Sequence, residues 1–457
     1  MRRLLPTLLP LSGAIGALIF GASPALAETG ISPAREFAPG QLLVKFEGQR
    51  RGEAIDLPRG LGVNAAAQAL QENRAVVYAE PNYLATASAR VEPFDPDDSG
   101  VLLEGAGSSS VTGKWAFKQW SFLGPKEPKG SPLPSSPGGI NAVDAWRHLI
   151  DVGRPGAAGV IVAVLDSGIA YRSTSEGFRP SPDFGPEQFV PGYDFVDHDQ
   201  FPLDESGHGT HVAGTIAEKT GNGIGLTGLA YGAKLMPVRV LDSTGVGDAL
   251  QISQGIRFAV SHGAQVINMS FNFRCDERVP IVDEALREAY ERGVVTVASA
   301  GNLGSEDCVS APATGPRVIG VGGTTEGACL GNYSLAGPDI DLVAPGGGEP
   351  RRRCPSVAAR PIYQVTLRAN SRSSFGIPAK YIGTSMAAAH VSGVAAMVLA
   401  SRRINPILDP QAQVRAVTKR LRSTARDLGL PQNQQGAGLL DAGAATGTGP
   451  KFISAPK

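Results

Sequence analysis

Cysteine, aromatic residues and excess charge are all scarce in this 457-residue chain. Four cysteines are too few to form the main scaffold of a domain. With aromatic residues at 6%, aliphatic side chains, Ala and Gly must build the core. Lys and Arg together number 42, as do Asp and Glu, so the formal net charge is zero. Nucleic acids and anionic membranes attract proteins with a basic excess, and neither is therefore expected as a partner.

Glycine and proline, by contrast, are abundant, with 58 and 35 copies. They favour tight turns and long loops over a helical bundle. Hydrophobic residues at 42% and charged residues at 18% are typical of a globular protein rather than a disordered one. The length corresponds to about three domain-sized units.

Residues 1–27 have the pattern of a secretory signal peptide. Arg2 and Arg3 supply positive charge, residues 4–20 are mostly apolar, and Ala25-Leu26-Ala27 is a small-x-small cleavage motif. A membrane anchor is the alternative, but proline and polar interruptions leave too few apolar residues for a span of about 20. No later apolar run is long enough to cross a membrane. The mature protein is therefore expected to be secreted, outside the cell or into a periplasm, where disulfides persist.

Residues 28–86 have the pattern of a small α+β unit. Strand-like runs at 41–46 and 75–79 enclose a helix-like run at 64–73, for which Asn64 is a candidate N-cap. A unit of about this size is only marginally stable by itself.

The rest of the chain divides into a linker, a long α/β stretch and a tail. Residues 87–139 are rich in Pro, Ser, Gly and Asp without an apolar period, which predicts a flexible linker, and residues 446–457 are expected to be a C-terminal tail. Residues 140–445 alternate between strand-like runs (160–165, 233–241, 266–270, 294–298, 318–321) and helix-like runs (208–219, 249–262, 279–292, 385–402). This alternation predicts a doubly wound, mostly parallel sheet flanked by helices, with functional groups at the carboxyl ends of its strands.

Three polar residues stand where such a sheet places its chemistry. Asp166 ends a buried strand, and His208 and Ser385 each begin a helix. A serine hydroxyl needs a base to take its proton, and the base needs a carboxylate to fix its tautomer. Taken singly, the aspartate could be a strand-end cap, the serine a helix N-cap, and His211 the base. Together the three predict nucleophilic catalysis.

The motifs around these residues resemble those of the subtilisin-like serine peptidases, the subtilases. They are Asp166-Ser-Gly, His208-Gly-Thr-His-Val-Ala-Gly and Gly383-Thr-Ser385-Met-Ala, in that chain order. The resemblance covers about residues 140–445 and implies a serine endopeptidase that works through an acyl-enzyme. It also implies that His211 is a packing residue. Asn302, in Ser299-Ala-Gly-Asn302, resembles the family's oxyanion asparagine, with the Ser385 N–H as second donor.

The resemblance extends to the surroundings of the nucleophile. Segments similar to those that pair with an extended substrate supply Gly245, Val246 and Gly247 on one side and Ser270, Phe271 and Asn272 on the other. Asn272 and Phe273 replace the glycine pair that is usual in the family. Ser299, Gly301 and Ser310 are expected to line the S1 pocket, and the place of Ala311-Pro312 resembles that of a cis bond in the family.

Structural calcium is expected at one or both of two loops that resemble calcium sites of the family. The first brings together Asp194, Asp197 and Asp199, carboxylates of the kind that Ca²⁺ prefers, although a solvated acidic turn is the alternative. In the second, the resemblance implies ligands from side chains and carbonyls of these residues: Asp183, Thr220, Asn222, Ile224 and Leu226. No cofactor is expected for catalysis.

The four cysteines allow three pairings. Proximity in the sequence favours Cys275 with Cys308 and Cys329 with Cys354. A zinc site is disfavoured because no CxxC spacing occurs.

The sequence thus predicts a secreted, calcium-dependent endopeptidase that acts as a monomer on proteins or peptides. Val76-Val-Tyr-Ala-Glu-Pro-Asn-Tyr83 resembles the end of a subtilase propeptide. The resemblance implies that Ser385 cuts its own chain between Leu84 and Gln119, and that the released unit of residues 28–86 then inhibits the enzyme as a product until it is degraded. One alternative is an inactive subtilase that serves as a binding scaffold. Another is a processing peptidase for basic sites, but Ser299 and Ser310 provide no acidic pocket.

Overall fold

The computed structural model describes residues 37–447 except for positions 59, 88–89, 92–113, 127–132, 223, 276, 306–307, 353, 355–358 and 406–407. The predicted signal peptide, most of the predicted linker and nearly all of the predicted tail lie outside the described residues. The chain forms two compact units, one of residues up to Leu84 with Asp248–Leu250, and one of the remainder.

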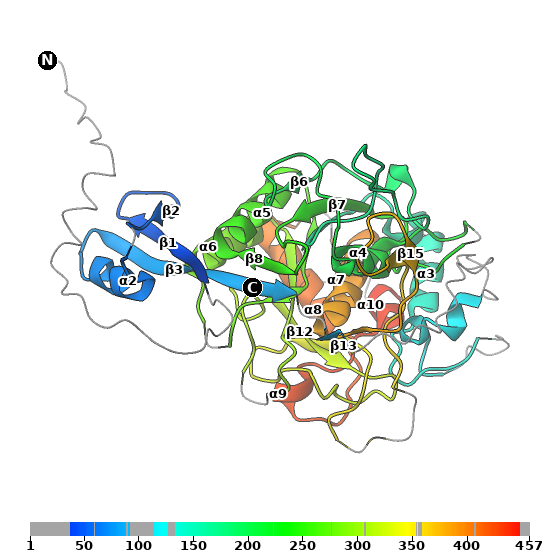
Figure 1. Ribbon diagram of the computed structural model, residues 1–457. Coiled ribbons are helices and arrows are strands. Elements are labelled where there is room, and N and C mark those ends of the chain that lie inside the picture. The colour runs from blue at the N-terminus through cyan, green and yellow to red at the C-terminus, as the bar shows by residue number, and fades with distance from the viewer. Residues whose placement is uncertain are drawn as a thin grey trace, which may run out of the picture. The chain divides into compact units, whose positions relative to one another are not determined.

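The first unit is an α+β fold, as predicted. It contains strands β1 (Phe37–Phe46), β2 (Glu53–Asp56) and the first part of β3 (Val76–Ala87), and helix α2 (Val63–Gln71). The strands are antiparallel in the order β2-β1-β3, and α2 packs on them (Figure 1). The small core includes Leu42, Val44 and Leu70. The prediction of Asn64 as N-cap is wrong: Gly62 occupies that position, and no side chain caps the helix.

The second unit is built on a seven-stranded sheet in the order β13-β12-β11-β9-β5-β7-β6, with every neighbouring pair parallel. Its strands are β5 (Ile161–Asp166), β6 (Tyr193–Asp194), β7 (Lys234–Arg239), β9 (Val266–Met269), β11 (Val295–Ser299), β12 (Ile319–Thr324) and β13 (Leu342–Pro345). The predicted doubly wound parallel sheet is confirmed. Strand order reverses beside β5, and such a switch point is where α/β sheets place their ligands.

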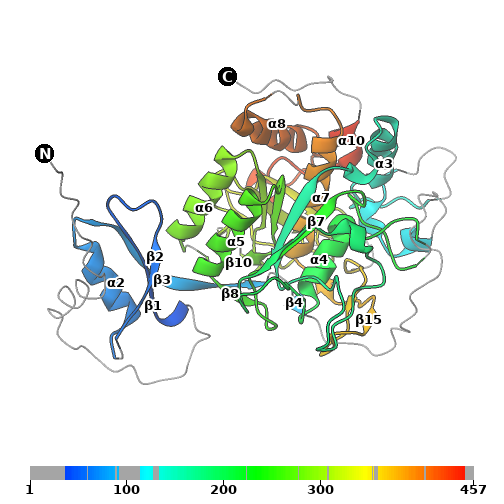
Figure 2. The same cartoon turned by 90° about the horizontal axis from the view of Figure 1, so that it is seen from above.

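Helices cover both faces of this sheet. They are α3 (Ala142–Asp151), α4 (His208–Ala217), α5 (Ala249–Ser261), α6 (Pro280–Glu291), α7 (Thr384–Ala400), α8 (Pro410–Ser423), α9 (Gln432–Gln435) and α10 (Ala442–Thr446). Figure 2 shows α5 and α6 on one face and α4 and α7 on the other. Helix α7 is mostly apolar, with no exposed polar face, and is almost wholly buried, as expected of a central helix.

Short strands complete the second unit. They are β4 (Arg90–Val91), β8 (Val246–Asp248), β10 (Phe271–Asn272), β14 (Thr366–Leu367), β15 (Phe375–Gly376) and β16 (Tyr381–Ile382). Strand β14 pairs with β15, and β4 pairs with β16, both antiparallel.

The prediction of a continuous linker up to residue 139 is wrong in its second half. Residues 114–117 and 120–122 form 3₁₀ turns, and Trp115, Trp120 and Phe122 are buried in the core of the second unit. The Trp120 indole N–H donates to the Pro361 carbonyl at 3.0 Å. The folded unit therefore begins well before residue 140, because three large aromatic side chains bury their surface without forming an apolar period.

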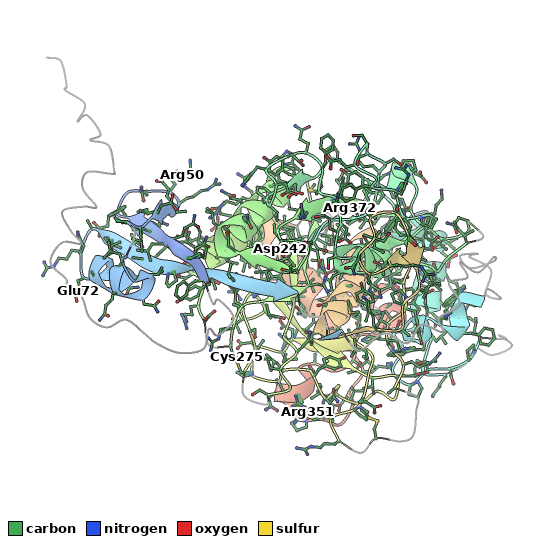
Figure 3. All side chains as sticks on the ribbon, viewed as in Figure 1. Arg50, Glu72, Asp242, Cys275, Arg351 and Arg372 are labelled. Carbon is green, nitrogen blue, oxygen red and sulfur yellow. A yellow bond between two sulfur atoms is a disulfide. The ribbon has the colours of Figure 1, made fainter. Side chains whose placement is uncertain are left out.

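Both favoured disulfides are present. Cys275, labelled in Figure 3, is bonded to Cys308, and Cys329 is bonded to Cys354. The Ala311–Pro312 peptide bond is cis, as its place in the sequence suggested. Among the residues that the structure describes, no helix has the length and apolar character needed to span a membrane.

Candidate functional site

The end of one strand and the start of one helix bring Asp166 and His208 together. Asp166 is the last residue of β5, and Gly207, with a φ of 88°, turns the chain so that α4 begins at His208. His208 Nδ1 lies 2.7 Å from Asp166 Oδ1, and both side chains are buried. This contact fixes the imidazole ring with its other nitrogen, Nε2, facing away from the carboxylate.

The surroundings of His208 stabilise its protonated form. Burial alone would lower the pKa of His208, but the charge of Asp166, its hydrogen bond and the more distant charge of Asp204 raise the pKa above its usual value. The ring of Tyr381 lies beside the imidazole, with 6.5 Å between the ring centroids. An imidazole that readily accepts a proton is suited to act as a general base.

Asp204 is a residue of this site that sequence reasoning missed. It is fully buried, and its carboxylate accepts hydrogen bonds from Ser167 Oγ and from the main chain and hydroxyl of Thr210. Ser167 Oγ in turn accepts the Gly209 N–H. The carboxylate thus ties the residue after Asp166 to the first turn of α4. The sequence feature that could have identified Asp204 is its position four residues before His208, in a polar run.

Helix α7, which runs beside α4 in Figure 1, begins with Thr384 and carries Ser385 in its first turn. Ser385 Oγ donates to the Ser270 carbonyl at 3.1 Å, and Ser270 Oγ donates back to the Ser385 carbonyl at 3.0 Å. His208 Nε2 is buried and has no hydrogen-bond partner among the described residues. The free nitrogen is thus available to a hydroxyl that turns away from Ser270.

A buried polar chain holds Ser270 in place. Ser392, two turns along α7 from Ser385, donates to Asn268 Oδ1 at 2.9 Å, and Asn268 Nδ2 donates to Ser270 Oγ at 2.9 Å. Asn268 lies in β9, whose other side chains are apolar. An asparagine in an otherwise apolar strand is the sequence feature that could have identified this buried polar chain.

Asn302 follows β11 at the same edge of the sheet. Gly301, with a φ of 113°, places it beside α7. Asn302 Oδ1 accepts the Thr384 N–H at 2.9 Å and the Thr384 hydroxyl at 3.0 Å. Asn302 Nδ2 is buried without a hydrogen-bond partner among the described residues. Since buried amide donors are nearly always paired, this one is suited to an oxygen of a ligand.

His211 does not take part in this arrangement. Its Nε2 lies 3.0 Å from the Ile362 carbonyl, and its ring stacks on Tyr381 with 4.0 Å between centroids. Burial lowers the pKa of His211 to about 3, so the ring stays neutral. The prediction that His211 is a packing residue fits this geometry.

The residues expected in the S1 pocket lie together. Ser299 Oγ donates to Asn272 Oδ1 at 3.2 Å, and a Cβ atom added to Gly301 would lie 3.1 Å from Ser310 Oγ. The Asn272 amide also donates to the Ser299 carbonyl. The Asn272 side chain is therefore held by hydrogen bonds to Ser299, a residue expected to line the S1 pocket. Gly245 has a positive φ and Val246 begins β8. Gly247 has no room for a side chain, because a Cβ atom there would lie 2.0 Å from the Val240 carbonyl oxygen.

The second loop at which calcium was expected contains two carboxyl groups that lack a cation among the described residues. Asp183 is fully buried and accepts the Asn222 amide at 2.8 Å and the Leu226 N–H at 2.6 Å. Glu218 is also fully buried, and neither of its oxygens makes a hydrogen bond of normal geometry there. Burial raises the pKa of both, and the charge of Asp183 raises that of Glu218 further. Oxygen donors and two uncompensated carboxyl groups fit Ca²⁺.

Glu218 was not among the sequence-predicted ligands. It is the C-cap residue of α4 and precedes the loop that contains Thr220 and Asn222. Gly225 supplies the space that the Asp183 carboxylate occupies, because a Cβ atom there would lie 1.8 Å from Asp183 Oδ2. Ile224 donates its N–H to Asn222 Oδ1 at 3.2 Å.

The first predicted calcium loop already contains a protein cation. The Arg239 guanidinium is buried, lies 2.8 Å from Asp194 Oδ2, and also contacts Asp197. Asp199 instead accepts the Phe201 N–H at 2.7 Å. Arg239 thus already supplies positive charge to Asp194 and Asp197, and Ca²⁺ at Asp194, Asp197 and Asp199 stays a prediction.

Comparison with known proteins identifies the family. A sequence model described as "Subtilase family" matches residues 157–438, more than half of the chain. A thermophilic serine proteinase of Bacillus sp. (strain AK1) is 32% identical over 343 residues, covering 75% of this chain and 68% of that protein. Subtilisin Savinase of Lederbergia lenta is 35% identical over 292 residues, covering 63% of this chain and 91% of that protein.

A solved structure with a similar fold is fervidolysin of Fervidobacterium pennivorans, described as a keratinolytic enzyme related to subtilisin. It aligns with a TM-score of 0.67 and 25% identity, covering 91% of this chain and 62% of that one. The chain belongs to the subtilase family and is a serine endopeptidase.

Proposed function

We propose that the chain is a secreted endopeptidase, made as a self-processing zymogen, in which Asp166, His208 and Ser385 form the catalytic triad. The observation that carries the proposal is the 2.7 Å contact between His208 and Asp166, which leaves His208 Nε2 as a buried nitrogen without a partner among the described residues. The first turn of α7 carries Ser385 at the same edge of the sheet. The substrates are proteins or peptides.

Peptide hydrolysis proceeds in two halves. A rotation of the Ser385 side chain away from the Ser270 carbonyl directs Oγ to His208 Nε2, which accepts the hydroxyl proton as Oγ attacks the scissile carbonyl carbon. The Asp166 carboxylate stabilises the imidazolium that forms. His208 then gives the proton to the leaving nitrogen, the C–N bond breaks, and an acyl-enzyme remains on Ser385. Water, activated by the same imidazole, hydrolyses that ester.

The negative charge of each tetrahedral intermediate falls on one oxygen. Asn302 Nδ2 is proposed as its side-chain donor, because Thr384 holds the other end of the amide with two hydrogen bonds. The main-chain N–H of Ser385 is the second donor, since the first turn of a helix leaves its N–H groups without intrahelical partners. Donors fixed before the reaction cost no reorganisation when the charge develops.

Export and self-inhibition rest on the N-terminal part of the chain. Residues 1–27 have the pattern of a signal peptide, and the first structural unit is a small α+β fold of the kind predicted for an inhibitory propeptide. The proposal is that this unit inhibits the enzyme as a product, after Ser385 has cut the chain between Leu84 and Gln119. Among the described residues, only the second unit contains the triad.

Calcium is proposed as a structural ion at the loop around Asn222. Asp183 and Glu218 would hold it with their carboxylates, and Asn222, Thr220, Ile224 and Leu226 are the sequence-predicted partners. The ion supplies the positive charge that two buried carboxylates need, and it takes no part in the reaction.

The test is labelling with a fluorophosphonate, which reacts with an activated serine. The expected result is one label per molecule on Ser385 of the wild-type protein, and none on a folded Ser385→Ala variant. An inactive scaffold would bind peptides but remain unlabelled. Cleavage of a peptide library then decides the specificity, and a strict requirement for basic residues would favour the processing-peptidase alternative.

A further inference from the structure

Beyond the first turn of α7, one side chain hydrogen-bonds to another element among the described residues. Ser392 is completely buried, and its hydroxyl donates to Asn268 Oδ1, in β9, at 2.9 Å. A hydroxyl inside a helix often donates to the carbonyl four residues back in the same helix. Three helical threonines of this chain do so: Thr215, Thr418 and Thr446. Ser392 instead directs its only proton out of α7.

The contacts that begin at Ser392 lead back to the start of the same helix. Asn268 Nδ2 donates to Ser270 Oγ at 2.9 Å, and Ser270 Oγ donates to the Ser385 carbonyl at 3.0 Å. All four residues are completely buried. Because each hydroxyl has one proton, every donor in this relay is used.

We infer that Ser392 is a positioning residue, which holds Ser385 in place through Asn268 and Ser270. The inference rests on the proposed role of Ser385 as the nucleophile. It goes beyond that role because it assigns a function in the reaction to a residue two helical turns away.

The spacing of the four residues turns the relay into a two-point attachment. Ser385 and Ser392 are seven residues apart, so they lie on one face of α7 and are separated by about 10 Å along its axis. Asn268 and Ser270 are two residues apart, so they project to the same side of the chain at the end of β9. Helix α7 packs against β9. It cannot slide or turn on that strand without breaking one of the two contacts.

The first turn of α7 depends on such contacts. Its N-cap residue, Gly383, has no side chain with which to cap the helix. Asn302 accepts the Thr384 N–H from one direction, and Ser270 donates to the Ser385 carbonyl from another. Most of the remaining helix is apolar, and apolar contacts are not directional. The polar relay therefore fixes the position of the helix, and losing it should make Ser385 less reactive without changing the contacts that bind a substrate.

The test compares Ser392→Thr with Ser392→Val, two side chains of nearly the same shape that differ in the hydroxyl. Both variants share the added methyl group and the cost of a branched residue in a helix. We expect Ser392→Val to react with a fluorophosphonate about tenfold more slowly than Ser392→Thr, the effect of one lost buried hydrogen bond. Steady-state kinetics on a peptide should show the same difference in kcat, with KM nearly unchanged.

Two further comparisons distinguish positioning from a general loss of stability. Ser401→Ala, the matched control, removes a buried hydroxyl at the C-cap of α7, which donates to the Val398 carbonyl within the helix at 2.8 Å. It should react with the fluorophosphonate as the wild type does, whatever its melting temperature. In a Ser270→Ala background the relay is already broken, so Thr and Val at position 392 should give equal rate constants.

Each outcome bears either on this inference or on the proposed function. Equal rate constants for folded Ser392→Thr and Ser392→Val would overturn the inference, and so would a difference between them that persists with Ser270→Ala. If Ser392→Val does not fold, the smaller Ser392→Ala is compared with the wild type, with the same tenfold loss expected and the same reading of equal rates. A wild-type protein that the fluorophosphonate does not label would instead overturn the proposed function.

Discussion

Asn302 and Thr384 are joined by two hydrogen bonds, in which the main-chain N–H and the hydroxyl of Thr384 both donate to Asn302 Oδ1, at 2.9 and 3.0 Å. Turning the amide over would break both bonds. The amide nitrogen is thereby held as a buried donor without a partner among the described residues. Since Thr384 immediately precedes Ser385, the proposed oxyanion donor is held by the neighbour of the proposed nucleophile.

Replacing Asn302 by Ala is therefore expected to reduce kcat by about 10²–10³, with little change in KM, because the lost hydrogen bond forms only in the transition state. Steady-state kinetics on a peptide substrate measure this. Asn332→Ala, which changes an exposed asparagine, is the control and should behave as the wild type. An Asn302→Ala enzyme with unchanged kcat would remove this residue from the oxyanion site.

Replacing Ser385 by Ala is expected to reduce kcat on the order of 10⁶, the loss known for the corresponding change in subtilisin itself. The precursor should also stay uncut. Ser261→Ala, which removes an exposed hydroxyl from α5, is the control. The triad assignment fails if a folded Ser385→Ala protein turns over peptide at the wild-type rate.

The acid limb of kcat/KM should report the titration of His208. The imidazole acts as a base only when neutral, and its pKa is raised above the usual 6.5, so activity should fall as the pH drops through a midpoint above 6.5. Asp204→Asn removes a charge that raises this pKa, and it should therefore move the midpoint to lower pH. Asp166→Asn would instead lose most activity. Superimposable profiles for the wild type and a folded Asp204→Asn variant would contradict the electrostatic role of Asp204.

Calcium should stabilise the folded enzyme, because an ion that binds only the native state raises its melting temperature by mass action. EDTA should lower the melting temperature, and Ca²⁺ but not Mg²⁺ should restore it, since Mg²⁺ demands a tighter octahedral site. Asp183→Asn and Glu218→Gln should each reduce the calcium-dependent shift, because each removes a negative charge from the proposed site.

The matched control for this measurement is Asp197→Asn. It alters the other acidic loop, where Arg239 already binds the carboxylates, and should leave the calcium-dependent shift unchanged. If Asp197→Asn abolishes the shift and Asp183→Asn does not, the ion binds at the first loop. A melting temperature that does not change with EDTA would contradict the proposal that calcium stabilises the enzyme.

The fold class could be predicted because each βα unit is encoded locally. A continuous run rich in β-branched residues, such as residues 160–165, predicts a strand buried on both faces, and the structure has β5 there. The boundary before the second unit could not be predicted, because Trp115, Trp120 and Phe122 follow no period and are recognisable as core only where they pack.

The sequence by itself determined which chemistry to propose, since Asp166, His208, Ser385 and Asn302 each belong to a short motif of residue types that serine peptidases use together. Only the tertiary structure decided which charged residues surround this site and the two acidic loops. Arg239 comes from a strand distant in sequence from Asp194 and Asp197, and only folding reveals that it supplies their cation. Likewise, Asp204 and Glu218 are ordinary acidic residues until burial removes their water, and a buried charge must then be balanced by hydrogen bonds, a proton or an ion.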